Sequence, residues 1–355
     1  SSRIGIQEFQ SDLRGFVYND SAPGVRLFGN YDNNRYQGNL AWFSRLDKDT
    51  NSGINSFSTR YENVFIANLY RQDLIALGHQ VEFSAIYRDD RAGDHDFHYD
   101  DNGVLRRPAS IGDERQKNIH STYLGLAGDG HIGRINTTTA FNYVFGSESH
   151  NSIAGQGTDI SAAMFAQEIS YDIDWIRVRA SFFWASGDDK PFDDEANGFD
   201  AINDLPNFAG GDLSYWQREG LPLIGGGEVF LTNRGSFLPN MRAGKEEGQS
   251  NFVNPGLLLY NLGVDFELTP KLKLITNATY LQFDQTESLE AVRQDGSIGH
   301  EIGFDLSAGL IYRPFLNNNV QMRFGTAALI SGNGIKNLYG DKTLYHGFTN
   351  LTLQY

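Results

Sequence analysis

The amino-acid sequence predicts an all-β protein, a transmembrane antiparallel up-and-down β-barrel of about 14 strands. Apolar and polar residues alternate along many segments, and short connections between these segments alternate with long ones. The 355 residues also include 39 glycines and an aromatic share of 13%, against only nine prolines. Because only every second residue of such a strand must be apolar, the chain needs no apolar run of the roughly 18 residues that form a membrane helix.

Period-two alternation places the individual strands. In the segment 174–187, the apolar Ile176 and Val178 alternate with Arg177 and Arg179. Several segments reach the roughly 9–11 residues that a tilted membrane-spanning strand needs. The fourteen predicted strands are, in order, 2–9, 23–31, 34–46, 63–74, 79–89, 119–128, 133–146, 159–172, 174–187, 255–268, 271–284, 300–313, 318–331 and 343–355. The apolar residues that mark the alternation include Ile4, Ile6, Leu40, Trp42, Val81, Phe83, Tyr87, Phe141, Tyr143, Phe145, Phe182, Trp184, Phe304, Leu306, Leu310, Met322 and Phe324.

The connections between the predicted strands fall into two classes. Short connections lie near 32–33, 75–77, 128–132, 172–174, 269–270 and 316–318. Long connections lie near 10–22, 47–62, 90–118, 147–158, 188–254, 285–299 and 332–342. Tight periplasmic turns that alternate with long extracellular loops are typical of bacterial outer-membrane barrels. We therefore expect one β-barrel domain over 1–355, with both termini on the turn side.

Composition excludes several functional classes. The 44 acidic and 29 basic residues give a formal charge of −15, which argues against a nucleic-acid partner. The absence of cysteine excludes disulfides, thiolate metal sites and cysteine nucleophiles. Ser147 and His150 lie close in sequence, but no elbow motif or third catalytic residue accompanies them. The sequence therefore predicts that the protein is not an enzyme.

The last predicted strand resembles the assembly signal of outer-membrane barrels. It carries alternating apolar residues and ends in an aromatic residue. The residues that we assign to this signal are Phe348, Leu351, Leu353 and Tyr355. The resemblance implies the barrel-assembly machinery as a partner.

The segment Arg3-Ile4-Gly5-Ile6-Gln7 resembles an Arg-x-Gly-x-Gln strand of the alginate-export-like porin family. The stretches 24–46 and 254–283 also have a similar strand-turn-strand layout. This resemblance implies a channel in the outer membrane of a Gram-negative bacterium, surrounded by the lipid bilayer. Family members carry about four strands ahead of this motif. The chain therefore corresponds either to a complete barrel of 14 strands or to part of a barrel of about 18.

If the apolar positions face lipid, the alternating polar positions face the lumen. The pore-lining candidates are Arg35, Arg45, Arg88, Arg134, Arg177, Arg179, Lys273, Arg323, Asp265, Glu267 and Asp305. A row of arginines attracts anions, while several weak sites let them leave. The resemblance implies an arginine-lined lumen for a polyuronate. The alternative is that these basic groups form ion pairs with the inward acids and brace the barrel.

The connection 188–254 is long enough to have a function of its own. We expect it either to fold into the lumen and constrict the pore or to form an extracellular cap that contacts a partner. Its first part is rich in acids, and carboxylate-rich loops can hold Ca²⁺. The candidate calcium ligands are Asp188, Asp189, Asp193, Asp194 and Glu195, although their spacing does not match an EF-hand. The alternative is that these acids form an ordinary solvated loop that binds no metal. We expect no cofactor other than calcium.

These observations predict passive passage of a polar solute through a porin-like channel, with an anionic small molecule or polysaccharide as the expected cargo. A second reading makes the barrel the sheath of a porin–cytochrome conduit around a multihaem cytochrome. A third makes the protein a surface receptor or adhesin that works through its loops.

Overall fold

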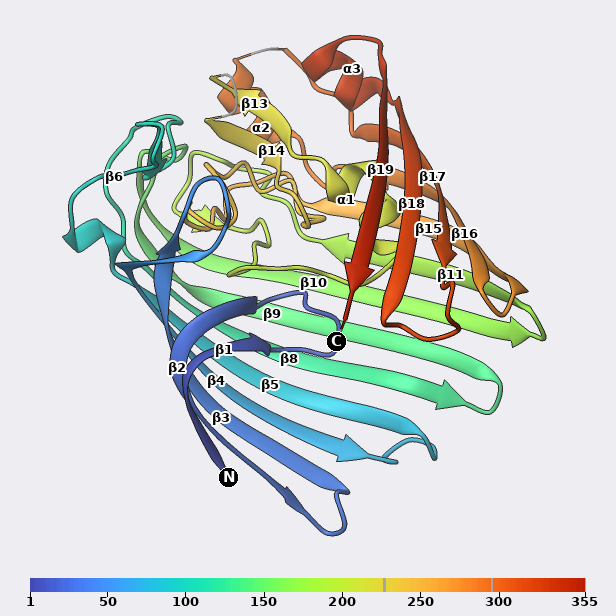
Figure 1. Cartoon of the computed structure of the whole chain (residues 1–355). Coiled ribbons are helices and arrows are strands. Elements are labelled where there is room, and N and C mark those ends of the chain that lie inside the picture. Colours follow the sequence, from blue (N-terminus) through green and yellow to red (C-terminus); the bar gives the residue numbers. More distant parts are fainter. Residues whose placement is uncertain (226–227, 295, 355) are drawn as a thin grey trace.

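The computed structural model describes residues 1–225, 228–294 and 296–354, and its main sheet is almost entirely antiparallel. Fourteen strands follow one another in chain order, each hydrogen-bonded to the next (Figure 1). They are β1 (Ser2–Gln10), β2 (Asn19–Tyr31), β3 (Tyr36–Lys48), β4 (Asn55–Gln72), β5 (His79–Asp90), β8 (Ile119–Ile132), β9 (Ile135–Asn151), β10 (Gln156–Ile173), β11 (Ile176–Ala185), β15 (Leu257–Thr269), β16 (Leu272–Gln282), β17 (Glu301–Tyr312), β18 (Val320–Ser331) and β19 (Thr343–Leu353).

Each of the fourteen predicted ranges overlaps one of these strands, but the predicted total of about 14 is wrong. The described residues contain nineteen strands. The additional ones are β6 (His98–Tyr99), β7 (Leu105–Arg107), β12 (Glu195–Ala196), β13 (Leu221–Ile224) and β14 (Val229–Thr232). They are two to four residues long, and all lie within the long connections. Such short pairings carry too few residues to show an alternating pattern.

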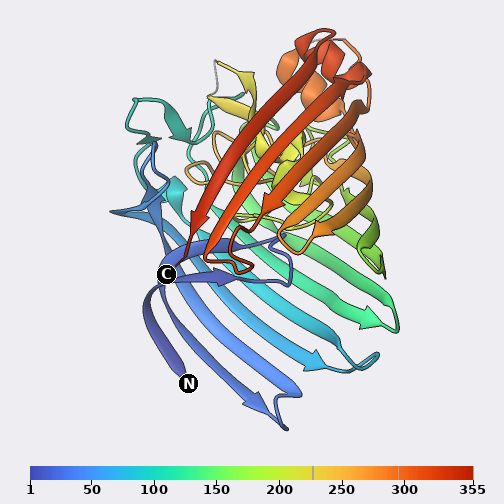
Figure 2. The same ribbon diagram turned by 45° about the vertical axis from the view of Figure 1, so that its right-hand side comes forward.

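The predicted closure of the barrel is also not found. Among the described residues, β1 pairs with β2 and β19 with β18, and no ladder joins β1 to β19. The sheet is strongly curved, and part of a long connection lies on its concave side (Figure 2). In this part of the connection, Asn203 forms an isolated β-bridge with Tyr18, the residue just before β2. Its helix α1 (Tyr215–Arg218) contacts β17, β18 and β19 near the other edge of the sheet. This part of the long connection therefore fills the interior between the two edges of the sheet.

The two faces of the sheet have opposite chemistry. On β9, Phe141 and Phe145 are exposed, whereas Asn142 and Val144 between them are buried. On β17, Phe304 and Leu306 are likewise exposed, and Asp305 between them is 1% exposed. The convex face is therefore apolar, and the concave face carries the buried polar side chains. This confirms the predicted alternation of apolar and polar faces.

Helices are short and lie in the connections. They are α1, α2 (Glu287–Arg293), α3 (Asn333–Tyr339) and the 3-10 turns η1 (Ala92–Asp94) and η2 (Gly211–Leu213). Within the described parts of the chain, none of these helices has the length and apolar character to cross a membrane.

Gly146 on β9 provides a test of the packing between strands. A Cβ at this position would lie 1.9 Å from the backbone oxygen of His120 on β8. We expect Gly146→Ala to lower the free energy of unfolding by about 1–3 kcal/mol, because the neighbouring backbone would have to move. Urea unfolding in detergent micelles measures this change. At Gly29 on β2, an added Cβ would meet no described atom within 4 Å. The control Gly29→Ala should therefore change stability by less than about 0.5 kcal/mol, and equal effects would contradict the packing.

Candidate polar passage

The inner segment, residues 197–225 and 228–254, packs against the concave face of the sheet. Its backbone accepts a hydrogen bond of 2.9 Å at the Asp200 oxygen from the hydroxyl of Tyr123 on β8. The Ala209 amide donates to Glu168 on β10 at 3.1 Å. Trp216 and Phe252 in this segment are fully buried. Hydrogen bonds to the strands and buried aromatic residues therefore hold the segment in the interior.

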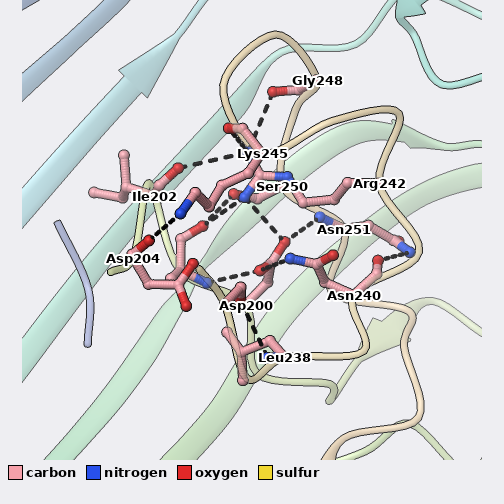
Figure 3. A network of polar contacts seen from close by, with 12 residues as sticks. Asp200, Ile202, Asp204, Leu238, Asn240, Arg242, Lys245, Gly248, Ser250 and Asn251 are labelled. Carbon is pink, nitrogen blue, oxygen red and sulfur yellow. Dashed lines mark hydrogen bonds and ion pairs between the residues drawn. The ribbon is translucent and has the colours of Figure 1, made fainter. Parts of the chain in front are cut away.

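Buried polar groups hold the inner segment together (Figure 3). The Asp200 carboxylate accepts hydrogen bonds from the Asn240 side chain at 2.9 Å and the Asn251 amide at 2.8 Å, and it lies 3.6 Å from the Arg242 guanidinium. Burial raises the pKa of Asp200, although Arg242 opposes this shift. Burial also raises the pKa of Asp204 to about 6. The Lys245 ammonium donates to the backbone oxygen of Asp204 at 2.6 Å.

A second buried group, the Glu62 cluster, connects the sheet to this segment. It consists of Asp20, Arg45, Lys48, Arg60, Glu62, Arg88 and Asp90, which come from β2, β3, β4 and β5. Three guanidinium groups surround the Glu62 carboxylate, at 2.9 Å from Arg45, 2.5 Å from Arg60 and 2.7 Å from Arg88. The side chains of all four residues are completely buried. Such a cluster is stable only when the opposite charges and hydrogen bonds compensate for desolvation.

Two arginines of the Glu62 cluster bind the inner segment directly. Arg60 donates to the backbone oxygens of Glu246 at 2.7 Å and Glu247 at 2.8 Å, and also to that of Gly248. Arg88 donates to the Ser250 hydroxyl at 2.7 Å. Glu62 thus orients the arginine side chains that attach the inner segment to the concave face of the sheet, which we call the wall.

A second attachment lies on the opposite side of the interior. The Asp305 carboxylate of β17 accepts hydrogen bonds from the Ser214 hydroxyl at 2.7 Å and the Trp216 amide at 2.9 Å, at the start of α1. Nearby, a Cβ at Gly309 would lie 2.5 Å from the Leu213 side chain, and one at Gly325 would lie 3.0 Å from it. The two glycines face each other on β17 and β18. Their missing side chains therefore let the segment approach the wall.

Three polar cavities lie along the inner segment. The loop-side cavity, about 400 Å³, borders the long connection that contains Asp49. The central cavity, about 1020 Å³, shares Arg234, Lys245 and Glu246 with it. The turn-side cavity, about 420 Å³, borders the short turn near His131. It shares the lining residues Asn207 and Arg323 with the central cavity. The cavities therefore follow one another from the long connections to the short turns.

The charge of the lining changes along this row. The central cavity is lined by five acidic residues, Glu8, Asp20, Asp212, Glu219 and Glu246, and by five basic residues, Lys48, Arg218, Arg234, Lys245 and Arg323. The turn-side cavity is lined by four arginines, Arg14, Arg177, Arg179 and Arg323, and by two carboxylates, Asp129 and Glu168. The excess of positive charge therefore lies on the turn side.

Seven of the eight predicted pore-lining cations, all except Lys273, divide into three groups. Arg177, Arg179 and Arg323 line the turn-side cavity. The prediction is wrong for Arg45 and Arg88, because the Glu62 cluster buries them completely. It is also wrong for Arg35 and Arg134, which lie in exposed turns where the strands end. Alternation gives the side of a strand but not the depth of a side chain, which neighbouring acids and covering segments decide.

The three cations that line the turn-side cavity form ion pairs. Among the remaining candidates, Lys273, Asp265 and Glu267 also form ion pairs, whereas Asp305 accepts hydrogen bonds. Arg177 pairs with Asp172 at 2.5 Å, and Arg323 with Asp212 at 2.6 Å. Asp265 accepts from Arg179 at 3.4 Å and lies 3.1 Å from Lys273. Glu267 also contacts Lys273, at 3.4 Å, and Asp305 holds α1.

Sequence reasoning missed Arg60, Glu62, Asp212 and Arg218. The sequence predicts a long connection over 47–62, which includes Arg60 and Glu62, but β4 begins at Asn55 and contains both residues. Asp212 and Arg218 lie inside the connection 188–254, where no period predicts which residues return to the wall. The repeated arginines near the loop ends of β3, β4 and β5 were the available signal for the cluster.

The candidate calcium site does not form. Among the described residues, no group of three or more His, Asp or Glu side chains is arranged to hold a metal ion. Asp188 is buried, and burial raises its pKa to about 6, whereas Asp189, Asp194 and Glu195 point to solvent. Asp193 instead accepts the Glu195 amide at 3.0 Å. Without a shared centre, these carboxylates remain separate loop residues.

The predicted assembly signal is only partly on one face. Leu351 and Leu353 are exposed on the convex face of β19. Phe348 instead lies on the concave face, where its ring packs 5.8 Å from that of His346 and lines the central cavity. Its even position places it on the face opposite the two leucines. The role of these residues as an assembly signal stays a prediction. Tyr355 lies outside the described residues.

Comparison with known proteins gives a structural likeness only. No family model and no curated protein matches the chain. The Pseudomonas aeruginosa protein OprD is 13% identical, with a TM-score of 0.45, over 98% of this chain and 76% of that chain. OccK2 (OpdF) from the same organism, solved in complex with glucuronate, is 11% identical, with a TM-score of 0.47, over 99% and 77%. OccK5 (OpdH), also from P. aeruginosa, is 12% identical, with a TM-score of 0.45, over 99% and 76%. These values do not identify the family of the chain, so membership of the alginate-export-like family stays a prediction.

Glu62 should be essential for the attachment of the inner segment. We expect Glu62→Gln to lower the free energy of unfolding by about 3–5 kcal/mol, because it removes the carboxylate that pairs with the buried Arg60 and leaves the other two guanidinium groups with one carboxylate each. Urea unfolding measures the loss, and limited proteolysis should cut faster near residues 243–250. The control Asp32→Asn removes an exposed pair with Arg35, 3.1 Å long, and should change stability by less than about 1 kcal/mol. Similar effects of the two substitutions would contradict the role of Glu62.

Proposed function

We propose that the protein is a channel for the passive passage of a polar solute across the outer membrane of a Gram-negative bacterium. The observation that carries this proposal is the row of three polar cavities from the long connections to the short turns. Neighbouring cavities share lining residues, so a solute meets hydrogen-bonding groups along the whole row. Several weak polar sites in sequence permit both entry and exit.

The convex face supports a membrane location. Large apolar side chains on most of the long strands are exposed there, including Leu27, Leu40, Trp42, Phe65, Phe83, Phe141, Tyr260, Leu262, Phe304 and Phe324. Water-soluble monomers rarely expose contiguous apolar patches of more than a few hundred Å². A lipid bilayer is the environment that fits a continuous apolar face of this kind.

The cargo that we propose is anionic, either a small molecule or a polysaccharide as in alginate-export-like porins. The excess of arginine in the turn-side cavity supports this choice, although Arg177 and Arg179 each have an acidic partner. Arginine stays charged at every relevant pH and can bind a carboxylate through two parallel hydrogen bonds.

The structure gives less support to the alternative functions. A sheath around a multihaem cytochrome would need a wide interior, whereas the inner segment packs Trp216 and Phe252 into that space. A receptor or adhesin would place its function in the outer loops, and no observation favours this over the polar passage.

Selectivity in planar bilayers tests the proposed function. The full-length protein should form open channels, and their reversal potential under a KCl gradient should show a preference for chloride. We expect Arg177→Ala with Arg179→Ala to reduce this preference, because both arginines line the turn-side cavity. The control pair Arg35→Ala with Arg134→Ala removes the same charge from exposed turns and should have little effect. A protein that inserts but conducts no ions would contradict the proposal.

Leu262 on β15 tests the membrane location separately. Its side chain is 69% exposed on the convex face, in the middle of the strand. In phospholipid vesicles, we expect Leu262→Arg to lower the free energy of unfolding by about 2–4 kcal/mol, because the charge would enter the hydrocarbon region. Leu262→Ala should have a smaller effect. If this face were in water, Leu262→Arg would change stability by less than about 0.5 kcal/mol.

A further inference from the structure

Four side chains meet where the central cavity joins the turn-side cavity. Asp212 and Arg218 belong to the inner segment, and Arg323 and Phe348 belong to β18 and β19. All four line the central cavity, and Arg323 also lines the turn-side cavity. We call this group the junction site. Here a carboxylate of the inner segment pairs with an arginine of the sheet beside the cavities.

One carboxylate serves two guanidinium groups in the junction site. Asp212 lies 2.6 Å from Arg323 and 3.3 Å from Arg218. Arg218 lies over the Phe348 ring, 3.5 Å from its centroid, and Arg323 lies 5.9 Å from the same centroid. The aromatic ring holds the cations by its electrostatic attraction and shields one side from water. The site therefore has one more positive than negative charge.

The guanidinium groups have unused capacity for hydrogen bonds. Each arginine carries five N–H donors in a planar fork. The Nε atom of Arg323 has no hydrogen-bond partner in the described structure, but it is buried, so an anion can reach this arginine only at its other N–H groups. The Asp212 side chain is 44% exposed, whereas those of Arg218 and Arg323 are 25% and 23% exposed. The carboxylate is thus the most accessible member, and another anion can approach the arginines from the cavity.

We propose that Asp212 is a built-in competitor that an anionic solute replaces at Arg323 and Arg218. In this inference, which rests on the proposed channel function, the ion pair between Asp212 and Arg323 occupies the junction when no solute is present. An arriving anion takes over the guanidinium donors, and Asp212 turns toward solvent. Asp212 therefore determines how strongly the junction retains an anion, while the arginines and Phe348 provide the site.

The positions of Asp212 and Arg323 make this exchange feasible. Asp212 lies in η2, between Gly211 and Leu213, and both Gly210 and Gly211 have positive φ angles, of 93° and 61°. The segment is anchored on the following residues by Asp305, which holds Ser214 and Trp216. A change at the Asp212 side chain can therefore occur while α1 remains in place.

The inference is tested by substitutions with opposite expected effects. Asp212→Asn removes the competitor, and we expect it to raise the affinity for acetate about tenfold, as for the loss of one competing charge-assisted hydrogen bond. Arg323→Gln and Arg218→Gln remove donors and should weaken acetate binding. Saturation-transfer NMR with acetate measures this binding on the full-length protein in detergent micelles. The chloride preference of channels in planar bilayers should follow the same order: it should rise in Asp212→Asn and fall in Arg323→Gln and Arg218→Gln.

A matched control separates the junction site from general electrostatics. Glu8→Gln removes one negative charge from the same central cavity, on β1, away from the junction site. We expect it to raise acetate affinity less than twofold. An equal effect of Glu8→Gln and Asp212→Asn would overturn the inference. So would a decrease in affinity for both Asp212→Asn and Arg323→Gln, which is the result expected of an ion pair that only anchors the segment.

The two measurements also separate this inference from the proposed function. If the channels do not conduct but acetate binding follows the expected order, the junction site is supported and the channel function fails. If the channels conduct with a chloride preference but acetate binding ignores the junction residues, the channel function stands and the inference is overturned.

Discussion

The ion cluster around Glu62 is the interaction on which the interior of this protein depends. The Glu62 carboxylate pairs with three guanidinium groups in a site closed to water, where an uncompensated charge would be very costly. Asp20 and Asp90 add a second carboxylate for Arg45 and Arg88. Two of the three arginines also bind the backbone and a hydroxyl of the inner segment. The position of the segment, and therefore the shape of every cavity beside it, follows from this pairing of charges.

Two of the attachments of the inner segment depend on buried carboxylates of the sheet, Glu62 and Asp305. The Glu62 cluster holds its later part near the long connections, and Asp305 holds α1 against β17. Gly309 and Gly325 allow close contact at the second attachment. Between these contacts the segment leaves the row of polar cavities. A broad concave sheet is thereby converted into a narrow route with many polar groups.

Charge is used in two ways along the concave face. At the centre of the Glu62 cluster, the side chains of Glu62, Arg45, Arg60 and Arg88 are completely buried and serve stability. At Arg177, Arg179 and Arg323 the pairs border cavities, and their donors remain within reach of a solute. The difference arises in part from the inner segment, which contacts Arg60 and Arg88 directly but leaves Arg177, Arg179 and Arg323 beside open space. The same residue type at equivalent positions of a strand therefore has different roles.

The sequence by itself determined the strands and their faces. Period two places Phe141 and Phe145 outward and Asn142 inward, because successive side chains of a strand point to opposite sides. The order of neighbours followed as well, since short connections join antiparallel strands. Only the tertiary structure decided which inward charges are buried, that no ladder joins β1 to β19 within the described part of the chain, and where the inner segment lies. These features depend on contacts between residues far apart in the chain, such as Arg60 with Gly248 and Asp305 with Trp216, and no local period encodes them.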